Sequence, residues 1–195
     1  MRDDRCGAVV LAAGAGRRLG GVAKALLRDG GASFLERVIT TAGGAGVAPV
    51  DVVVVVGPPF AAAVSAEARR LGATVSFNPT PERGMASSVA LGFAAHAADV
   101  AITMALLWPV DHPRVALATL TALRAHGEGV PAYRGRGGHP PLVPRRLFGA
   151  LAGCADAVGG ARDVLGALDR IAVDDAAVVT DVDDAGDLER MCSPG

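Results

Sequence analysis

This sequence has few aromatic residues, only three cysteines and almost no net charge. Aromatic residues make up 4% of the chain, whereas hydrophobic residues of all kinds make up 51%, mainly alanine, valine and leucine. Such a composition favours layers of sheet and helix packed with small aliphatic side chains. A chain of 195 residues can bury a substantial core in one domain, so we expect a single domain over residues 1–195.

The three cysteines, Cys6, Cys154 and Cys192, are odd in number and lack C-x-x-C spacing. They therefore argue against a disulfide framework and a zinc site, and favour a reducing cytoplasm. The net charge of −1 argues against a broad basic surface for nucleic acid. No run has the length of a membrane helix, and residues 1–6 lack the apolar segment of a signal peptide. We expect a cytoplasmic protein without nucleic-acid or membrane partners.

Apolar runs alternate with amphipathic segments along the chain. Strands are predicted at 8–11, 50–56, 75–77, 100–110, 130–133, 171–173 and 178–179, and helices at 33–44, 61–71, 85–97, 115–126, 145–152, 162–168 and 186–191. This alternation predicts right-handed crossovers and a three-layer α/β/α sandwich with a mostly parallel, Rossmann-like sheet. The stretch 127–144 is interpreted as an insertion that flanks the site.

The loop that follows the first predicted strand is rich in glycine. The apolar run Ala8-Val9-Val10-Leu11, which fits a buried strand, stops at Ala12-Ala13-Gly14-Ala15-Gly16. Glycines let the backbone turn sharply and leave N–H groups uncovered, and convergent N–H groups bind anions. Arg17, Arg18 and Lys24 add full positive charge, so a polyphosphate is the expected ligand.

Two familiar phosphate-binding motifs do not fit this loop. Leu19 stands where the dinucleotide fingerprint needs its third glycine, and no Gly-Lys-Ser/Thr follows for a P-loop. The remaining pattern, L-A-A-G-x-G-x-R-x-G-x-x-x-K, resembles the signature loop of the MobA-like NTP transferase family. That resemblance implies the nucleotide-diphospho-sugar transferase type of fold, with Arg18 and Lys24 contacting the phosphates of the nucleotide.

Asp111 directly follows a buried strand, where a carboxylate suits the floor of a crevice better than a core. It could bind Mg²⁺ together with substrate phosphates, or cap the next helix. V-D-x-P resembles the family motif that supplies a metal-binding aspartate, which favours the first interpretation. The late stretch TDVDDAGDLER resembles a degraded D-I-D-T-P-E-D-L, in which Asp184, Ala185 and Gly186 depart from the motif. From it we expect a second carboxylate, Asp181 or Asp183; a solvated acidic loop is the alternative.

The segment NPTPERGMASSVALG, residues 78–92, resembles the family's N-P-x-x-x-x-G-M-x-x-S-x-x-x-G segment, which lies near the base. Gly84 opens a helix whose N-terminus offers free N–H groups, and Ser87 and Ser88 could hydrogen-bond a base or a ribose. The expected nucleotide-binding residues are Leu11, Ala12, Ala13, Gly14, Ala15, Gly16, Arg18, Lys24, Asn78, Gly84 and Ser88.

Gly138-His139-Pro140 resembles the G-H-P segment of the molybdenum cofactor cytidylyltransferase branch, which borders the acceptor pocket. Gly160-Ala161-Arg162 partly matches that branch's D-x-G-A-R, with Val158 in place of its aspartate. The resemblance therefore implies that His139 and Arg162 bind the acceptor.

The resemblance implies a nucleotidyltransferase that uses Mg²⁺, with Arg18, Lys24 and Asp111 as its catalytic residues. It favours CTP as the nucleoside triphosphate, molybdopterin as the phosphorylated acceptor, and a molybdoenzyme apoprotein as a partner. Two alternatives stay open: a sugar phosphate or alcohol phosphate as acceptor, and a nucleotide-binding accessory protein without turnover.

Overall fold

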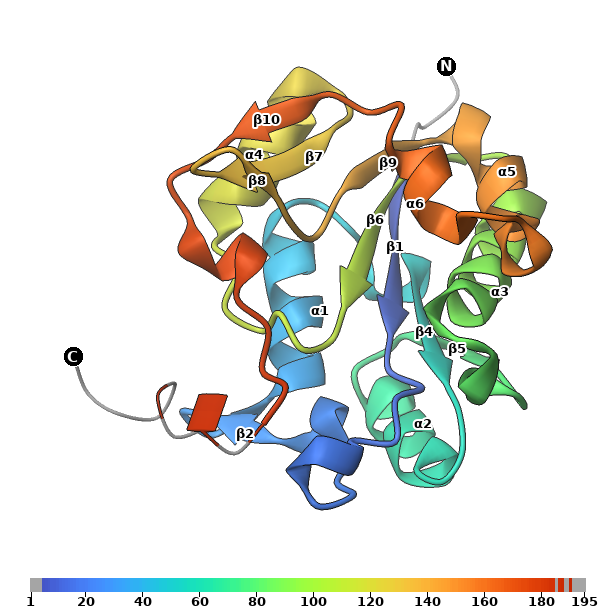
Figure 1. Ribbon diagram of the computed structural model, residues 1–195, viewed down its shortest axis with the longest axis vertical. Coiled ribbons are helices and arrows are strands. Elements are labelled where there is room, and N and C mark those ends of the chain that lie inside the picture. Colours follow the sequence, from blue (N-terminus) through green and yellow to red (C-terminus); the bar gives the residue numbers. More distant parts are fainter. Residues whose placement is uncertain (1–4, 185, 188–189, 191–195) are drawn as a thin grey trace.

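A computed structural model describes residues 5–184, 186–187 and 190 of the chain. Its central sheet has five strands in the order β5-β4-β1-β6-β9 (Figure 1). Their bounds are Arg5–Leu11 (β1), Val52–Val56 (β4), Thr74–Phe77 (β5), Ile102–Pro109 (β6) and Leu142–Pro144 (β9). Strands β5, β4, β1 and β6 run parallel and β9 pairs antiparallel with β6, which confirms the mostly parallel sheet.

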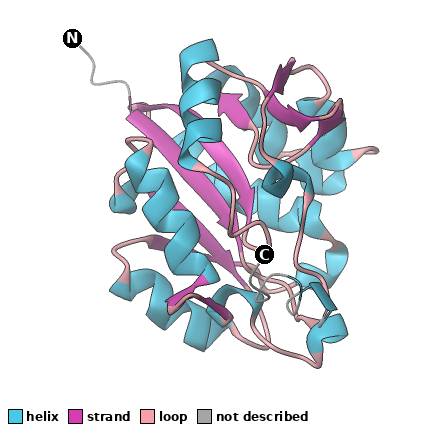
Figure 2. Cartoon of the chain, turned by 90° about the vertical axis from the view of Figure 1, so that its left-hand side faces the viewer, coloured by secondary structure: helices cyan, strands magenta, loops and turns pink. Residues whose placement is uncertain are grey.

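Helices cover both faces of this sheet (Figures 1 and 2). They are Phe34–Gly44 (α1), Ala61–Arg70 (α2), Met85–Ala98 (α3), Leu117–His126 (α4), Phe148–Ala152 (α5) and Gly160–Leu165 (α6). Alternate residues of each strand enter different cores: Ala8 and Val10 pack toward α1, α2 and α4, whereas Val9 and Leu11 pack toward α3 and α5. The predicted three layers follow from this alternation, because both faces of each central strand are apolar.

Helix α3 packs unusually close to the sheet. A Cβ atom on Gly92 would lie 2.2 Å from Cγ1 of Val9 and 3.2 Å from Cγ2 of Val55. A hydrogen atom is therefore the only side chain that fits between α3 and β1. Gly92, the last glycine of the 78–92 motif, therefore permits the close packing of α3 on the sheet.

The insertion at 127–144 builds parts of two sheets. Strands Val130–Tyr133 (β7) and Arg136–Gly137 (β8) form a small sheet with Arg170–Ala172 (β10), and the same stretch then supplies β9 to the central sheet. A second small element is the hairpin of Arg28–Asp29 (β2) and Ala32–Ser33 (β3).

One predicted strand is wrong and one predicted helix is partly untested. Residues 178–179 belong to a 3-10 helix, Ala176–Val179 (η7), because the Asp175 carboxylate caps it by accepting the N–H of Ala177. The predicted helix at 186–191 includes positions 188, 189 and 191, which lie outside the described residues. Nowhere in the described ranges is a helix both long and apolar enough to span a membrane.

The topology places the first loop beside Asp111. Strands β1 and β6 are parallel neighbours, and their last residues, Leu11 and Pro109, pair in register. From β1 the chain continues to β4 and β5 on one side and then returns to β6 on the other. Ligands of open α/β sheets bind at such a switch point, outside the carboxyl ends of the strands.

Candidate active site

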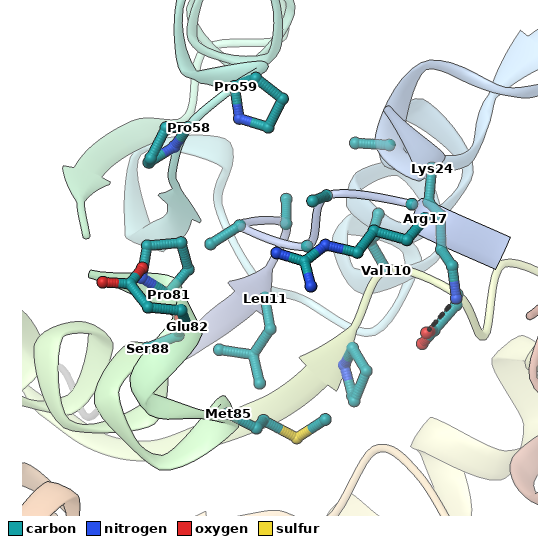
Figure 3. Close-up of a pocket in the computed structure, with 18 of the residues that line it drawn as sticks. Leu11, Arg17, Lys24, Pro58, Pro59, Pro81, Glu82, Met85, Ser88 and Val110 are labelled. Atoms are coloured by element: carbon teal, nitrogen blue, oxygen red, sulfur yellow. Dashed lines mark hydrogen bonds and ion pairs between the residues drawn. The ribbon is translucent and has the colours of Figure 1, made fainter. Parts of the chain in front are cut away.

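A cavity of about 660 Å³ opens at this edge of the sheet (Figure 3). Four loops that follow strands β1, β4, β5 and β6, together with the start of α3, form its walls. Its lining consists of Leu11, Ala12, Ala13, Gly14, Ala15, Gly16, Arg17, Lys24, Ala25, Pro58, Pro59, Pro81, Glu82, Gly84, Met85, Ser88, Pro109, Val110 and Asp111. The predicted residues 11–16 thus all face one cavity with Lys24, Gly84, Ser88 and Asp111.

The backbone of the first loop is shaped to present N–H groups. Gly16 has a φ of +56°, and a Cβ atom there would lie 1.9 Å from the Val22 carbonyl oxygen, so only glycine fits. Within the described part of the chain, no acceptor takes the N–H groups of Gly14, Ala15 or Gly16. Uncovered N–H groups lining a concave surface can bind phosphate oxygens.

Lys24 joins two carboxylates at one end of the cavity. Its Nζ donates to Oδ2 of Asp111 at 3.1 Å and to Oδ1 of Asp183 at 2.6 Å. Burial works to lower the pKa of Lys24, but the hydrogen bond to Asp183 and the charge of Asp111 outweigh it, so the pKa lies above its ordinary value. The hydrogen bond from Lys24 also lowers the pKa of Asp183. Lys24 and Asp183 are therefore both charged at neutral pH.

The late acidic stretch reaches Lys24, which lines the cavity, through Asp183. The N–H of Val182 donates to the carbonyl oxygen of Asp111 at 3.0 Å, which fixes this stretch beside the end of β6. Asp183 also accepts a 2.8 Å hydrogen bond from Nη1 of Arg18, whose side chain is 75% exposed. Asp181 is exposed and lines a separate, smaller cavity with Pro113 and Thr180. Of the two candidates, Asp183 is the one that lies next to Lys24 and Asp111.

The carboxylates of Asp111 and Asp183 suit a hard divalent cation. They already converge on one ammonium group, so two anionic oxygen donors meet at one point. Among the described residues no cluster of three or more histidine, cysteine or acidic side chains is arranged for a metal. A pair of carboxylates fits Mg²⁺, which keeps several waters and takes its remaining ligands from substrate phosphates.

Asn78 supports the cavity wall from behind. Its side chain is 1% exposed, and its Nδ2 donates to Oγ of Ser87 and Oγ of Ser88, both at 2.9 Å. Its Oδ1 accepts the N–H of Thr80. Asn78 thereby joins the loop after β5 to the first turn of α3, and Gly84, with a φ of +100°, turns the chain into that helix. Of Asn78, Ser87 and Ser88, only Ser88 lines the cavity.

A family model for the MobA-like NTP transferase domain matches residues 8–171, more than four fifths of the chain. The chain belongs to the MobA-like NTP transferase family. It is therefore a nucleotidyltransferase, and the cavity at the switch point is its candidate active site. A comparison with curated proteins finds no match.

Solved structures are similar to this chain over nearly its whole length. The crystal structure of Rv0371c from Mycobacterium tuberculosis is 31% identical, with a TM-score of 0.82, and the alignment covers 98% of this chain and 99% of that one. A complex of Rv0371c with manganese is similar at 27% identity and a TM-score of 0.74, covering 96% and 98%. Molybdopterin-guanine dinucleotide biosynthesis protein A from Archaeoglobus fulgidus shares the fold at 16% identity and a TM-score of 0.64, covering 95% and 96%.

In this MobA-like transferase the G-H-P segment lies beside the metal-binding candidate Asp111. The His139 and His112 rings are 5.1 Å apart, and η7 holds both: the His139 N–H donates to the Val178 carbonyl, and Nδ1 of His112 lies 3.1 Å from the Ala177 carbonyl. Burial, followed by the neighbouring His112, lowers the pKa of His139 to about 4. Its Nδ1 is buried and has no hydrogen-bond partner among the described residues. His139 is therefore neutral at pH 7.

Arg162, the other predicted acceptor residue, lies apart from His139. It is exposed on α6, and it lines neither of the two described cavities. Within the described ranges its side chain forms no hydrogen bond or ion pair, although its backbone carbonyl accepts the N–H of Gly166. Val158, in the loop before α6, is 97% exposed. Helix α6 packs against the core that contains α3 and α5, whereas His139 contacts η7, which packs against the other core, so the two predicted acceptor residues lie on elements of different cores.

Pro58, Pro59 and Glu82 line the cavity but do not stand out in the sequence. Pro58 and Pro59 follow β4, and Glu82 follows β5, so all three occupy the carboxyl edge of the sheet. The rule that placed the first loop and Asp111 at the site could therefore have found them. Arg17, whose charge was expected beside the loop, faces the cavity (Figure 3). Arg18 instead donates a hydrogen bond to Asp183.

Proposed function

We propose that this chain transfers a nucleotidyl group from a nucleoside triphosphate to a phosphorylated small molecule, with Mg²⁺ as its metal. The observation that carries the proposal is the convergence of Lys24, Asp111 and Asp183 beside the uncovered N–H groups of the first loop. Cations and N–H groups suit a triphosphate, and the paired carboxylates suit the metal that accompanies it.

The reaction requires little covalent chemistry from the protein. An oxygen of the acceptor phosphate attacks the α-phosphorus in line, the bond to the bridging oxygen of the β-phosphate breaks, and pyrophosphate leaves with its electron pair. The N–H groups of residues 14–16, with Arg17, Arg18 and Lys24, would bind the leaving pyrophosphate. Asp111 and Asp183 would hold the metal, which supplies charge neutralisation at the reacting phosphate. An ionised acceptor phosphate is already nucleophilic, so no general base is required.

We propose CTP as the nucleotide. Ala13 in L-A-A-G and the G-H-P segment support the cytidylyltransferase branch. Glu82 favours CTP over UTP. Its carboxylate lies on the cavity wall away from Lys24 (Figure 3), and it forms no ion pair with any described residue. The exocyclic amino group of cytosine can donate to a carboxylate, whereas the corresponding uracil oxygen would be repelled. Glu82→Gln, whose amide can also donate, should therefore reduce the preference for CTP over UTP.

We propose molybdopterin as the acceptor and a molybdoenzyme apoprotein as the recipient of the product. Support comes from the G-H-P segment and from the position of His139 close to His112, the residue after Asp111. A cytoplasmic location is supported by Cys6 and Cys154, which are buried free thiols. A sugar phosphate or an alcohol phosphate remains the rival acceptor.

Pyrophosphate release tests this proposal. The protein is supplied with Mg²⁺, each nucleoside triphosphate in turn, and molybdopterin, a sugar phosphate or an alcohol phosphate. We expect pyrophosphate only with CTP and molybdopterin, and its loss in Asp111→Asn. Asp174→Asn, an exposed acid outside the cavity, is the matched control and should keep the wild-type rate. Release with another acceptor would reassign the substrate, and nucleotide binding without release from any acceptor would refute the enzymatic proposal.

A further inference from the structure

The phosphate-binding cations of this site are already neutralised by a carboxylate of the chain itself. Asp183 lies 2.6 Å from Nζ of Lys24 through Oδ1 and 2.8 Å from Nη1 of Arg18 through Oδ2. Each oxygen of one carboxylate therefore engages a different basic group of the first loop. A phosphate oxygen bound to both cations would have to take the place of this carboxylate.

The same carboxylate belongs to the pair that suits a divalent cation. Asp183 and Asp111 share the Lys24 ammonium, whose side chain is 16% exposed. If the two carboxylates turn to a metal ion, they release Lys24, and Asp183 also releases Arg18. A metal–nucleotide complex supplies both partners at once: the metal ion binds the two carboxylates, and the phosphates bind the released Lys24 and Arg18. A metal-free nucleotide brings only the phosphates, and it leaves Asp183 unpaired beside them.

We propose that Asp183 makes this site selective for the metal complex of the nucleotide, by occupying Lys24 and Arg18 whenever no metal is bound. This inference rests on the proposed function. Asp183 acts as a specificity-determining residue: it penalises free triphosphate and favours metal triphosphate through the exchange of partners among four side chains. A metal ligand without ion pairs to Lys24 and Arg18 would not compete with phosphate for these two cations.

The position of Asp183 is well fixed, so the exchange has a defined starting point. The Asp187 carboxylate accepts the N–H groups of Asp183 and Asp184 at 2.9 and 3.0 Å, and Val182 is tied to the Asp111 carbonyl. The adjacent acid Asp184 is exposed and uses its Oδ1 to accept the N–H of Asp187. Asp184 therefore offers a control with the same charge, one residue away, that contacts neither Lys24 nor Arg18.

Binding measured with and without metal tests the proposal. The dissociation constants of CTP and of inorganic tripolyphosphate are measured by calorimetry in EDTA and in Mn²⁺ or Mg²⁺, for the wild type, Asp183→Asn and Asp184→Asn. We expect Asp183→Asn to bind both anions about tenfold more tightly in EDTA, because a competing ion pair is removed. With metal present, the same variant should bind CTP more weakly than the wild type. Asp184→Asn should match the wild type in both conditions.

Each other outcome has a defined meaning. Unchanged or weaker binding by Asp183→Asn in EDTA would overturn the inference, as would equal tightening by Asp184→Asn, which would indicate a general effect of charge. In either case, metal-dependent binding of CTP by the wild type would leave the proposed function intact. Absence of nucleotide binding by the wild type with metal would instead refute the proposed function and this inference with it. Circular dichroism and the unfolding temperature verify that each variant is folded.

Discussion

The buried imidazole of His139 should make this protein less stable as the pH falls below neutrality. Burial and the nearby His112 lower the pKa of His139 from 6.5 to about 4 in the folded state. His139 therefore becomes protonated near pH 6.5 in the unfolded chain but only near pH 4 in the folded chain. The stabilisation is fully present above the unfolded value and is lost as the pH falls toward the folded one. At about 1.4 kcal/mol per pH unit, the complete loss over the shift from 6.5 to about 4 is about 3.5 kcal/mol, of which about 2 kcal/mol falls between pH 7 and pH 5.

Urea unfolding across this pH range measures the effect. Trp108 is the only tryptophan and is fully buried, with its Nε1 donating to the His112 carbonyl, so its fluorescence reports on this region. His96 also has a lowered pKa through burial and contributes a slope of the same sign. The informative quantity is therefore the difference between the wild type and His139→Gln. Measurements that stop at about pH 5 stay above the range in which the carboxylates with lowered pKa values, such as Asp183, lose their stabilisation.

His139→Gln should remove about 2 kcal/mol of the pH-dependent change between pH 7 and pH 5. The control is His126→Gln, which replaces an exposed histidine at the end of α4 and should keep the wild-type slope. A full wild-type slope in His139→Gln would show that His139 takes up its proton at about the same pH in the folded and the unfolded chain. The account of its neutral, buried environment would then be wrong.

Two further substitutions test the packing that supports the cavity. Gly92→Ala should lower the free energy of unfolding by about 1–3 kcal/mol, because the added Cβ atom would lie 2.2 Å from Val9 Cγ1. The control is Gly149→Ala, at a helical glycine with open space around it. Equal stabilities of the two variants would contradict the close approach of α3 to β1. Asn78→Ala should cost about 2–3 kcal/mol and raise KM for the nucleotide, because Thr80, Ser87 and Ser88 lose their partner. A normal KM with normal stability would show that Asn78 does not hold the cavity wall.

Local patterns were sufficient to predict the central layers but not the edges of the fold. The runs that form β1 and β4 are apolar on both faces, and this property alone indicates a buried parallel strand. Strand β9 is only three residues long, and it exists because β6 offers it an edge, which no local pattern records. Val178-Val179 has the β-branched composition of a strand, yet the carboxylate of Asp175 caps a 3-10 helix there. Here a local side-chain hydrogen bond outweighs the strand propensity of the two valines.

The parts of the site that depend on backbone geometry were also predictable. Glycine at 14 and 16 permits a turn with uncovered N–H groups, and the topology then brings Asp111 to the same edge. The role of Asn78 could not be predicted in the same way. An asparagine that hydrogen-bonds two serines and a loop N–H cannot be distinguished, in the sequence, from one that binds a ligand. The structure gives Asn78 a supporting contact, and its predicted contact with nucleotide stays a prediction.

The sequence alone does not distinguish Asp181 from Asp183 as the second carboxylate. In a regular strand, residues two apart point to the same side, so periodicity would place both carboxylates together. The chain is irregular here, because the Asp187 side chain accepts two successive N–H groups and turns the backbone at Asp183. Asp183 therefore reaches Lys24, while Asp181 lines the smaller cavity. That outcome depends on contacts between segments more than 150 residues apart, such as Lys24 and Asp183, which are separated by 159 positions. The selectivity proposed for Asp183 depends on the same long-range contact, so a variant that leaves the Lys24–Asp183 pair intact should retain it.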